Sequence, residues 1–230
     1  MEISQARFAG GRARPRTIPG GIGGAAYETS PLGFGEEVLA RIASTGATEP
    51  RVALGLNLDV MTGYAYALVP PGRVLDPAVD FLASGQWDLS AGSYESGAIA
   101  FVKLRHFLAA LRPELVFYAD PGGPPPARPA PFDSTSAKSA AVYRATLTWT
   151  VADWASQHGV PCRAVPIGTI KRRGTGRGVA RKSDLVPAAN ALLGLALDPA
   201  QAELTGVDRV ADAALGLLVG LEEHVREARS

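Results

Sequence analysis

Basic side chains and glycines are concentrated in residues 165–182, which read VPIGTIKRRGTGRGVARK. Six of these side chains are basic and none is acidic. The six are Lys171, Arg172, Arg173, Arg177, Arg181 and Lys182. Glycines leave backbone amides accessible, so a loop of this composition can contact phosphates with both its backbone and its side chains. We predict that these residues, with Thr175, bind a nucleic-acid backbone; the alternative is an ordinary solvated surface.

Two carboxylates follow in the segment VDRVADAAL, residues 207–215. Asp208 and Asp212 are four residues apart, which places them on one face of a helix. Carboxylate oxygens are ligands that Mg²⁺ prefers in proteins. Together with cations for a phosphate backbone, this pair indicates metal-assisted phosphodiester chemistry. Two aspartates that simply face solvent are the alternative interpretation.

The elements that must position these residues alternate between strand and helix along most of the chain. Strands are predicted at 51–59, 63–69, 80–89, 114–119 and 161–166, with a Met-Thr-Gly turn joining the first two. Helices are predicted at 35–44, 96–111, 136–157, 179–193 and 207–225. The proline-rich residues 121–131 are expected to form an extended loop. Three antiparallel strands followed by alternating helix and strand predict an α/β fold with a mixed sheet covered by helices.

Five segments of the chain, in the same order, resemble the motifs of one protein family. They are ALGLNLDVMTGYAYAL (53–68), SGQWDL (84–89), LVFYADPGG (115–123), VPIGTIKRRGTGRGVARK (165–182) and VDRVADAAL (207–215). The family is that of the RuvC-like Holliday-junction resolvases, in particular the small phage and bacterial group of the ribonuclease H-like superfamily. The resemblance covers roughly residues 50–222. We therefore divide the chain into a Gly/Pro/Arg-rich N-terminal arm with a short helix (1–48) and a RuvC-like domain (49–230).

The resemblance implies a ribonuclease H-like fold, in which the first three strands of a mixed sheet are antiparallel, the later ones are parallel and helices flank the sheet. It also implies Mg²⁺- or Mn²⁺-dependent cleavage, with four acidic side chains holding two metal ions roughly 4 Å apart. Lys171 and Lys182 would then position the scissile backbone. A four-way junction presents two symmetric strands that a two-fold protein matches, so the resemblance also leads us to expect a homodimer.

Two of the four expected acidic positions do not carry an acid. The first-strand position matches Asn57, and the fourth-strand position matches Ala119. Asp59 projects from the same strand face as Asn57, about 6–7 Å further along. Asp120 projects from the face opposite to Ala119 unless the strand has already ended. The candidate catalytic positions are Asn57, Asp59, Ala119, Asp120, Asp208 and Asp212, and the candidate metal ligands are Asp59, Asp208 and Asp212.

Three interpretations of this altered site remain open. In the first, the chain is a natural homologue that has kept the DNA-binding shape and lost cleavage. In the second, the asparagine and alanine are deliberate substitutions that trap a complex. The third is a rearranged centre built from Asp59, Asp120, Asp208 and Asp212. The predicted function is binding of branched or duplex DNA, with metal-dependent cleavage of Holliday junctions. The alternative is an inactive RuvC-like protein, without a metal cofactor, that acts as a DNA-binding or assembly component.

Composition sets broader limits on function. The net charge is only +1 over 230 residues, so DNA affinity must come from local patches. The single cysteine, Cys162, excludes a disulfide framework, and with three histidines a zinc cluster is not expected. The sequence contains no membrane-spanning run and no signal peptide. We therefore expect no membrane partner and a cytoplasmic location in a bacterial or phage-infected cell.

Three further expectations concern the arm and the aromatic residues. Against Glu2, four arginines give residues 1–25 a local net charge of +3. Such an arm is either a solvated tail or a segment that folds onto a partner such as nucleic acid. Trp87 and Trp149 are expected in the core rather than as stacking platforms for bases. His106 is expected to pack or to face solvent rather than to act in catalysis.

Overall fold

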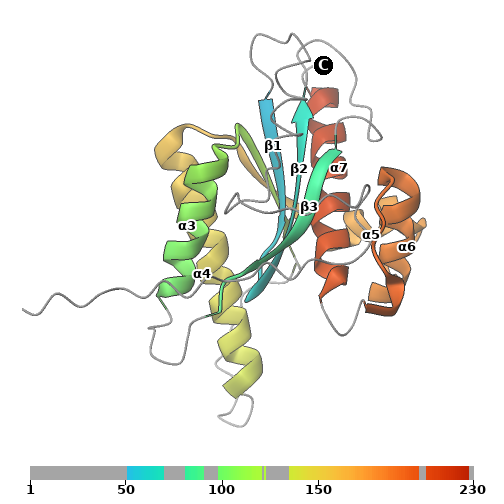
Figure 1. Cartoon of the computed structure of the whole chain (residues 1–230), viewed down its shortest axis with the longest axis horizontal. Coiled ribbons are helices and arrows are strands. Elements are labelled where there is room, and N and C mark those ends of the chain that lie inside the picture. The colour runs from blue at the N-terminus through green and yellow to red at the C-terminus, as the bar shows by residue number, and fades with distance from the viewer. Residues whose placement is uncertain are drawn as a thin grey trace, which may run out of the picture.

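A computed structural model of the chain contains a five-stranded mixed sheet (Figure 1). It describes residues 51–69, 81–90, 98–120, 122, 135–201 and 206–227. The strands are β1 (Arg51–Asn57), β2 (Met61–Val69), β3 (Phe81–Asp88), β4 (Leu115–Asp120) and β5 (Cys162–Pro166). Their order is β3-β2-β1-β4-β5; β1, β2 and β3 are antiparallel, whereas β4 and β5 run parallel to β1. The predicted arrangement of a ribonuclease H-like sheet is confirmed.

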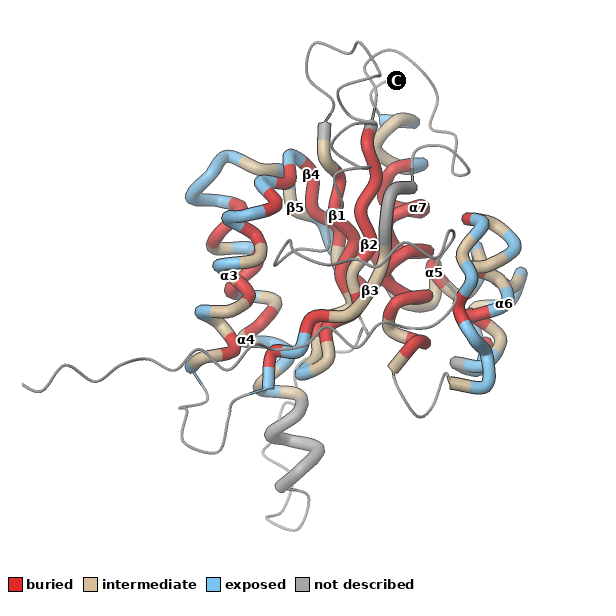
Figure 2. The backbone as a smooth tube through the Cα atoms, viewed as in Figure 1, coloured by how far each residue is buried: buried red, intermediate tan, exposed pale blue. Residues whose placement is uncertain are grey.

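Helices cover both faces of this sheet. They are α3 (Ile99–Leu111), α4 (Thr135–His158), α5 (Ile167–Thr175), α6 (Lys182–Leu193) and α7 (Val207–Glu227), with a 3₁₀ turn at Pro199–Gln201. Figure 1 shows α3 and α4 on one side of the sheet and α5, α6 and α7 on the other. In Figure 2, the central strands and most of α7 are buried, while α3, α4 and α6 present exposed outer surfaces. No helix within the described ranges is long and apolar enough to cross a membrane.

Alternate residues of β1 contribute to two hydrophobic cores, one on each face of the sheet. Ala53 belongs to the core beneath α7, which also contains Ile170 of α5. Leu54 and Leu56 belong to the core beneath α3 and α4. This alternation follows from the pleat of a strand, whose successive side chains point to opposite faces. The sheet is therefore buried on both sides, as the continuous apolar run at residues 114–119 predicted for β4.

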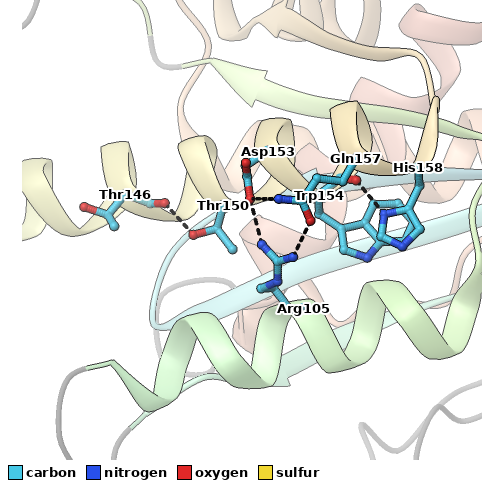
Figure 3. Close-up of polar contacts among 7 residues, drawn as sticks. All are labelled: Arg105, Thr146, Thr150, Asp153, Trp154, Gln157 and His158. Atoms are coloured by element: carbon cyan, nitrogen blue, oxygen red, sulfur yellow. Dashed lines mark hydrogen bonds and ion pairs between the residues drawn. The ribbon is translucent and has the colours of Figure 1, made fainter.

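Polar contacts connect α3 to α4, the two helices that cover the core containing Leu54 and Leu56 (Figure 3). The Arg105 guanidinium donates to Asp153 and to Gln157, each at 2.7 Å. The Gln157 amide donates to the same Asp153 oxygen at 2.9 Å. Because the Arg105–Asp153 ion pair is partly exposed, its contribution to stability is about 1 kcal/mol or less. The network orients the two helices more than it stabilises them.

Glycines allow α7 to lie unusually close to the sheet. A Cβ atom at Gly55 would lie 2.4 Å from the Ala213 carbonyl oxygen, and one at Gly63 would lie 2.2 Å from the Arg209 carbonyl oxygen. Neither distance is possible for a real carbon atom, so β1 and β2 can approach the helix backbone only where they carry glycine. The first turns of α7 are thereby placed over the end of β1.

The turn between the first two strands differs from the prediction. Residues 61–63 begin β2, and the turn consists of residues 58–60. The Thr62 hydroxyl closes this turn, because it donates to the Asp59 carbonyl at 2.6 Å and accepts from the Asp59 amide at 3.2 Å. The Met-Thr-Gly motif therefore stabilises the turn from inside the following strand.

The basic stretch is also different from the prediction, because its first half is a helix and not a loop. Ile170 of α5 is fully buried, and Ile167 packs against the same core. This three-residue spacing puts both side chains on one helical face. The helix ends at Gly176, which adopts a left-handed conformation with φ of 75° and donates its amide to the Arg172 carbonyl. Three of the six cations are consequently held on a rigid element.

The two tryptophans have different environments. Trp87 is 4% exposed and stacks between Tyr64 and Phe107, with ring centroids 4.8 and 4.7 Å away. The core prediction is confirmed for this residue. It is wrong for Trp149, which is 65% exposed because α4 turns Leu147 and Val151 toward the core instead. His106 is exposed on α3, as expected.

Candidate functional site

The carboxyl ends of β1, β4 and β5 meet at one edge of the sheet because these strands are parallel. Leu56 of β1 lies opposite Tyr118 of β4, so Asn57 and Ala119 come next on neighbouring strands. Ala119 packs in the core beneath α7, and Asn57 hydrogen-bonds to that helix. The two positions that match expected acids therefore face the same helix at the same edge.

Helix α7 begins at this edge and carries the two aspartates. Gly63 lies opposite Asn57 in the β1–β2 ladder, and its contact with the Arg209 backbone fixes the first turn of α7 beside it. Asp208 and Asp212 are only 3% and 6% exposed. The interpretation of these aspartates as solvent-facing residues is therefore wrong. Burial of a carboxylate costs free energy unless hydrogen bonds, opposite charge or a metal compensate it.

Asn57 provides part of that compensation. Its amide nitrogen donates a hydrogen bond of 2.9 Å to the Asp212 carboxylate. An aspartate in this place would have no proton to donate at neutral pH and would add a second negative charge within the same distance. Asn57 thus gives Oδ2 of the Asp212 carboxylate a neutral hydrogen-bond donor in place of a second negative charge.

Asp59 forms an ion pair that sequence reasoning did not identify. Its carboxylate lies 3.1 Å from the Arg209 guanidinium, and both side chains are about three-quarters buried, at 23% and 28% exposed. Arg209 also donates weakly to the Met61 carbonyl, at 3.5 Å. The signal in the sequence is a cation directly after Asp208, but its partner is 150 residues away in the chain. Asp59 is therefore neutralised by α7.

Asp120 points away from α7. Its neighbour Ala119 faces the α7-side core, and successive strand residues alternate. The Asp120 carboxylate accepts a hydrogen bond of 3.0 Å from the Gly122 amide. Tyr118 lies toward the α3–α4 side of the sheet. Its pKa is raised mainly by burial, and to a smaller extent by the nearby Cys162 thiol and Asp120 carboxylate. The structure therefore does not bring Asp120 together with Asp208 and Asp212.

These side chains do not fit a two-metal centre. Within the described ranges, no three His, Cys, Asp or Glu side chains are grouped so that they could hold a metal ion. Of the three candidate ligands, Asp59 is paired with Arg209, and only Asp208 and Asp212 remain at the edge. Ala119 offers no oxygen, and Asn57 presents its amide nitrogen to Asp212. Mg²⁺ requires oxygen ligands and compensating negative charge, and this donor set supplies too little of both.

The predicted phosphate-binding residues lie on α5, on the turn after it and at the start of α6. Because α5 directly follows β5, it begins at the same edge as the acidic pair, and it packs beside α7 (Figure 1). Arg172, Arg173, Arg177 and Arg181 are exposed, and Lys171 is half-buried. The structure therefore groups the described cations on one side of the molecule; it does not describe the Lys182 side chain.

The cations differ in their partners. Arg173 forms a two-pronged ion pair with Glu222 of α7, and this contact raises the pKa of Arg173. Arg177 lies at 4.0 Å from Asp184 and is 74% exposed. Lys171, Arg172 and Arg181 form no side-chain ion pair with an acidic residue in the part of the chain that the structure describes.

Two contacts shape the turn that follows α5. The Thr175 hydroxyl donates to the Lys171 carbonyl at 2.9 Å and accepts from the Arg177 amide at 3.3 Å. At the start of α6, the Asp184 carboxylate accepts from the Arg181 amide at 3.0 Å. Thr175 is thus engaged with the backbone and has a structural role in presenting the cations. Arg177 and Arg181 remain available on an ordered turn.

Known proteins of similar structure provide an independent comparison. No protein-family model matches the sequence, and no curated protein matches it. RuvC from Thermus thermophilus is 19% identical, with a TM-score of 0.50 over 76% of this chain and 96% of that one. The same protein in complex with a Holliday junction substrate is 18% identical, with a TM-score of 0.53 over the same shares. The yeast mitochondrial Holliday junction resolvase Ydc2 is 13% identical, with a TM-score of 0.46 over 80% of this chain and 84% of Ydc2.

The two RuvC comparisons establish the fold. Nearly the whole of the Thermus chain is matched, and the strand order and directions agree with a ribonuclease H-like sheet. The chain therefore has a RuvC-like fold, as its sequence motifs predict. At these identities, the roles of individual residues rest on the chemistry of the site itself.

Proposed function

We propose that this protein binds branched or duplex DNA through its phosphates, using a cationic surface made of Lys171, Arg172, Arg177 and Arg181. One observation carries the proposal: three of these cations have no acidic side-chain partner among the described residues, although the chain as a whole is nearly neutral. Cations that are not already neutralised can release counterions from DNA when they bind phosphates. The RuvC-like fold supports the proposal, since a Thermus RuvC of the same fold is found with a Holliday junction.

The geometry favours DNA binding without cleavage. In-line hydrolysis by two metal ions requires carboxylates that hold both ions and neutralise their charge. Asn57 instead donates a hydrogen bond to one oxygen of the Asp212 carboxylate, and Arg209 neutralises Asp59. Asp208 and Asp212 are the residues that would contact Mg²⁺ or Mn²⁺ if a cation entered, and a bound ion would supply positive charge near a phosphate. We infer that the chain acts as an inactive RuvC-like protein, as a DNA-binding or assembly component in a bacterial or phage-infected cell.

Junction cleavage is the second candidate function. The observation in its favour is the burial of Asp208 and Asp212 at the carboxyl edge of the parallel strands, because buried acid pairs are unusual without a functional reason. A labelled four-way junction incubated with the chain and Mn²⁺ or Mg²⁺ distinguishes the two candidates. Uncut DNA that is nevertheless bound is expected, and metal-dependent cutting would favour the second candidate.

The cationic surface is tested by Arg172→Gln. We expect affinity for a labelled four-way junction to fall roughly three- to tenfold at about 0.1 M salt, because one phosphate contact is lost. The slope of log K against log salt should become shallower by about 0.9 for the same reason. Lys171→Gln should act in the same way. Fluorescence anisotropy over a salt series measures both quantities.

Arg144→Gln is the matched control for this prediction. Arg144 is an exposed arginine on α4, which lies on the other side of the sheet (Figure 1). Its replacement makes the same change in net charge far from the cationic surface, so binding should stay within about twofold of the unchanged chain. Equal losses for Arg172→Gln and Arg144→Gln would contradict a localised phosphate contact.

We also propose that the protein acts as a homodimer, since a four-way junction presents two equivalent strands to a two-fold protein. Helix α4 offers a surface for this contact. Val142 and Trp149 are 66% and 65% exposed and lie seven residues apart. Two exposed alanines continue the same spacing, Ala145 between them and Ala152 after Trp149. This spacing forms one apolar stripe along the helix. A large exposed stripe of this kind is typical of protein contacts.

Trp149→Glu tests the dimer. A buried tryptophan anchor is commonly worth about 2 kcal/mol or more in an interface, so the dimer dissociation constant should rise roughly 30-fold or more. Light scattering coupled to size exclusion, over a concentration series, measures this change. Val179→Glu is the control, because Val179 is 95% exposed but lies between α5 and α6. A monomeric unchanged chain, or equal effects of both changes, would refute the α4 dimer.

A further inference from the structure

Among the residues that the structure describes, Arg173 is the one cation of α5 that an acid on another helix engages. Its Nε atom donates to the two Glu222 carboxylate oxygens at 3.2 and 3.1 Å, and a terminal nitrogen donates to one of them at 2.8 Å. This is the planar, two-pronged geometry that arginine also uses to bind phosphate. Glu222 therefore occupies the edge of Arg173 that a backbone phosphate would otherwise bind.

The neighbouring cations show what this contact changes. Lys171 and Arg172 lie one or two positions before Arg173 on the same helix, and neither forms a side-chain ion pair within the described residues. The hydrogen bond that Arg173 donates to the Glu222 carboxylate is the largest cause of the raised pKa of Arg173. Arg173 thus keeps its proton, but its charge is balanced by Glu222. A balanced cation adds little to counterion release when DNA binds.

The pair is also placed so that it can open. The Arg173 and Glu222 side chains are 39% and 44% exposed, so water and salt weaken their attraction. No buried group would be left unsatisfied if the two side chains separated, because both ends can be hydrated. A phosphate that arrives at Lys171 and Arg172 can therefore compete with Glu222 for the same guanidinium.

We propose that Glu222 limits the DNA affinity of this protein by occupying Arg173 in competition with a backbone phosphate. This inference rests on the proposed DNA-binding function. In the free protein, Arg173 is held by α7, and the cationic surface binds DNA with Lys171 and Arg172. Arg173 joins them only where a phosphate is positioned well enough to displace the carboxylate. Glu222 is therefore a residue that sets affinity and salt dependence without contacting DNA.

Glu222→Gln tests the inference, because it removes the charge and keeps the shape of the side chain. Affinity for a labelled duplex or four-way junction is expected to rise roughly three- to tenfold at about 0.1 M salt, through one additional phosphate contact. The slope of log K against log salt should become steeper by about 0.9. Adding Arg173→Gln to Glu222→Gln should abolish the gain, and Arg173→Gln alone should change binding less than twofold.

Glu227→Gln is the matched control. Glu227 also lies on α7 and forms an exposed ion pair with an arginine, Arg163 of β5. Both substitutions remove one negative charge from the same helix, so a general electrostatic effect would appear in both. Only Glu222→Gln releases a cation of α5. A gain confined to Glu222→Gln and dependent on Arg173 supports the inference.

The outcomes separate this inference from the function on which it rests. If the unchanged chain binds DNA and Glu222→Gln binds equally well or more weakly, the competition is refuted while DNA binding stands. Equal gains for Glu222→Gln and Glu227→Gln would also refute it. If neither the unchanged chain nor any variant binds DNA, both the inference and the proposed function are overturned.

Discussion

Replacing Gly63 with alanine is expected to destabilise the protein by about 3 kcal/mol or more, the upper end for overpacked sites. The new Cβ atom would lie 2.2 Å from the Arg209 carbonyl oxygen and 2.3 Å from its carbonyl carbon. These are backbone atoms of α7, and Gly63 itself lies within the β1–β2 ladder. Neither element can yield by a side-chain rotation, so the helix and the sheet must separate. Chemical denaturation followed by circular dichroism measures the loss.

The effect should reach beyond stability, because the same contact places α7 over Asn57. Gly63→Ala displaces the first turn of α7 and with it the Asn57–Asp212 hydrogen bond and the Asp59–Arg209 ion pair. Gly168→Ala is the control, since a Cβ atom there would meet nothing within 4 Å. Alanine within α5 should be neutral or stabilise by up to about 1 kcal/mol. A Gly63→Ala protein as stable as the unchanged chain would contradict the close approach of α7.

Asn57→Asp is expected to destabilise the protein by about 3 kcal/mol at neutral pH in the absence of divalent cations, which is the order of the cost of an uncompensated buried charge. The change replaces a donated hydrogen bond of 2.9 Å with two facing carboxylates. Mn²⁺ or Mg²⁺ should recover part of this loss, because a cation between carboxylates provides the missing charge. Thermal unfolding with and without the metal measures both effects.

Asn57→Ala separates the charge from the hydrogen bond. It removes the donor to Asp212 without adding a carboxylate, so it should cost about 1–2 kcal/mol and show no response to divalent cations. The unchanged chain should likewise gain little from the metal. A strong metal response of the unchanged chain would mean that Asp208 and Asp212 already form a cation site, contrary to the non-cleaving function proposed above.

Asn57→Asp also tests whether the site derives from that of a cleaving enzyme. Asn57→Asp combined with Ala119→Glu supplies acids at the two positions that face α7 at the ends of β1 and β4. Cleavage of a four-way junction by this combined variant, but not by the unchanged chain, would indicate a resolvase scaffold that lacks two of its acids. Cleavage by neither would indicate a DNA-binding protein whose site has diverged further.

Local patterns were sufficient to predict most of the elements. Alternating apolar residues predicted the first two strands, and a continuous apolar run predicted β4. The observed β3, β4 and β5 each lie within about two residues of the expected range. The error at the basic stretch has a local cause: its glycines suggested a loop, whereas Ile167 and Ile170 already carried the three-residue spacing of a helix. The arm at residues 1–48 lies outside the described residues, so its role stays a prediction.

The candidate site was predictable in its positions but not in its contacts. Motif order pointed to Asn57, Ala119, Asp208 and Asp212, and the structure places all four at one end of the sheet beside α7. No local pattern could show that Arg209 would neutralise Asp59 or that Glu222 would hold Arg173. These partners are 150 and 49 residues apart in the chain, and they meet only because α7 packs across the sheet.

From the sequence alone, we could predict the order of the strands and of every described helix except α5, and the segment that concentrates positive charge. The sequence also showed that two expected acids are absent from an otherwise recognisable order of motifs. Those properties depend on residue type and short-range periodicity, which can be read along the chain. Which charges are neutralised and which carboxylates are buried could be seen only in the folded chain. The electrostatic energy of a charged side chain depends on its distance from other charges and on its removal from water. In this protein, both are set where α7 packs against Gly55 of β1 and Gly63 of β2.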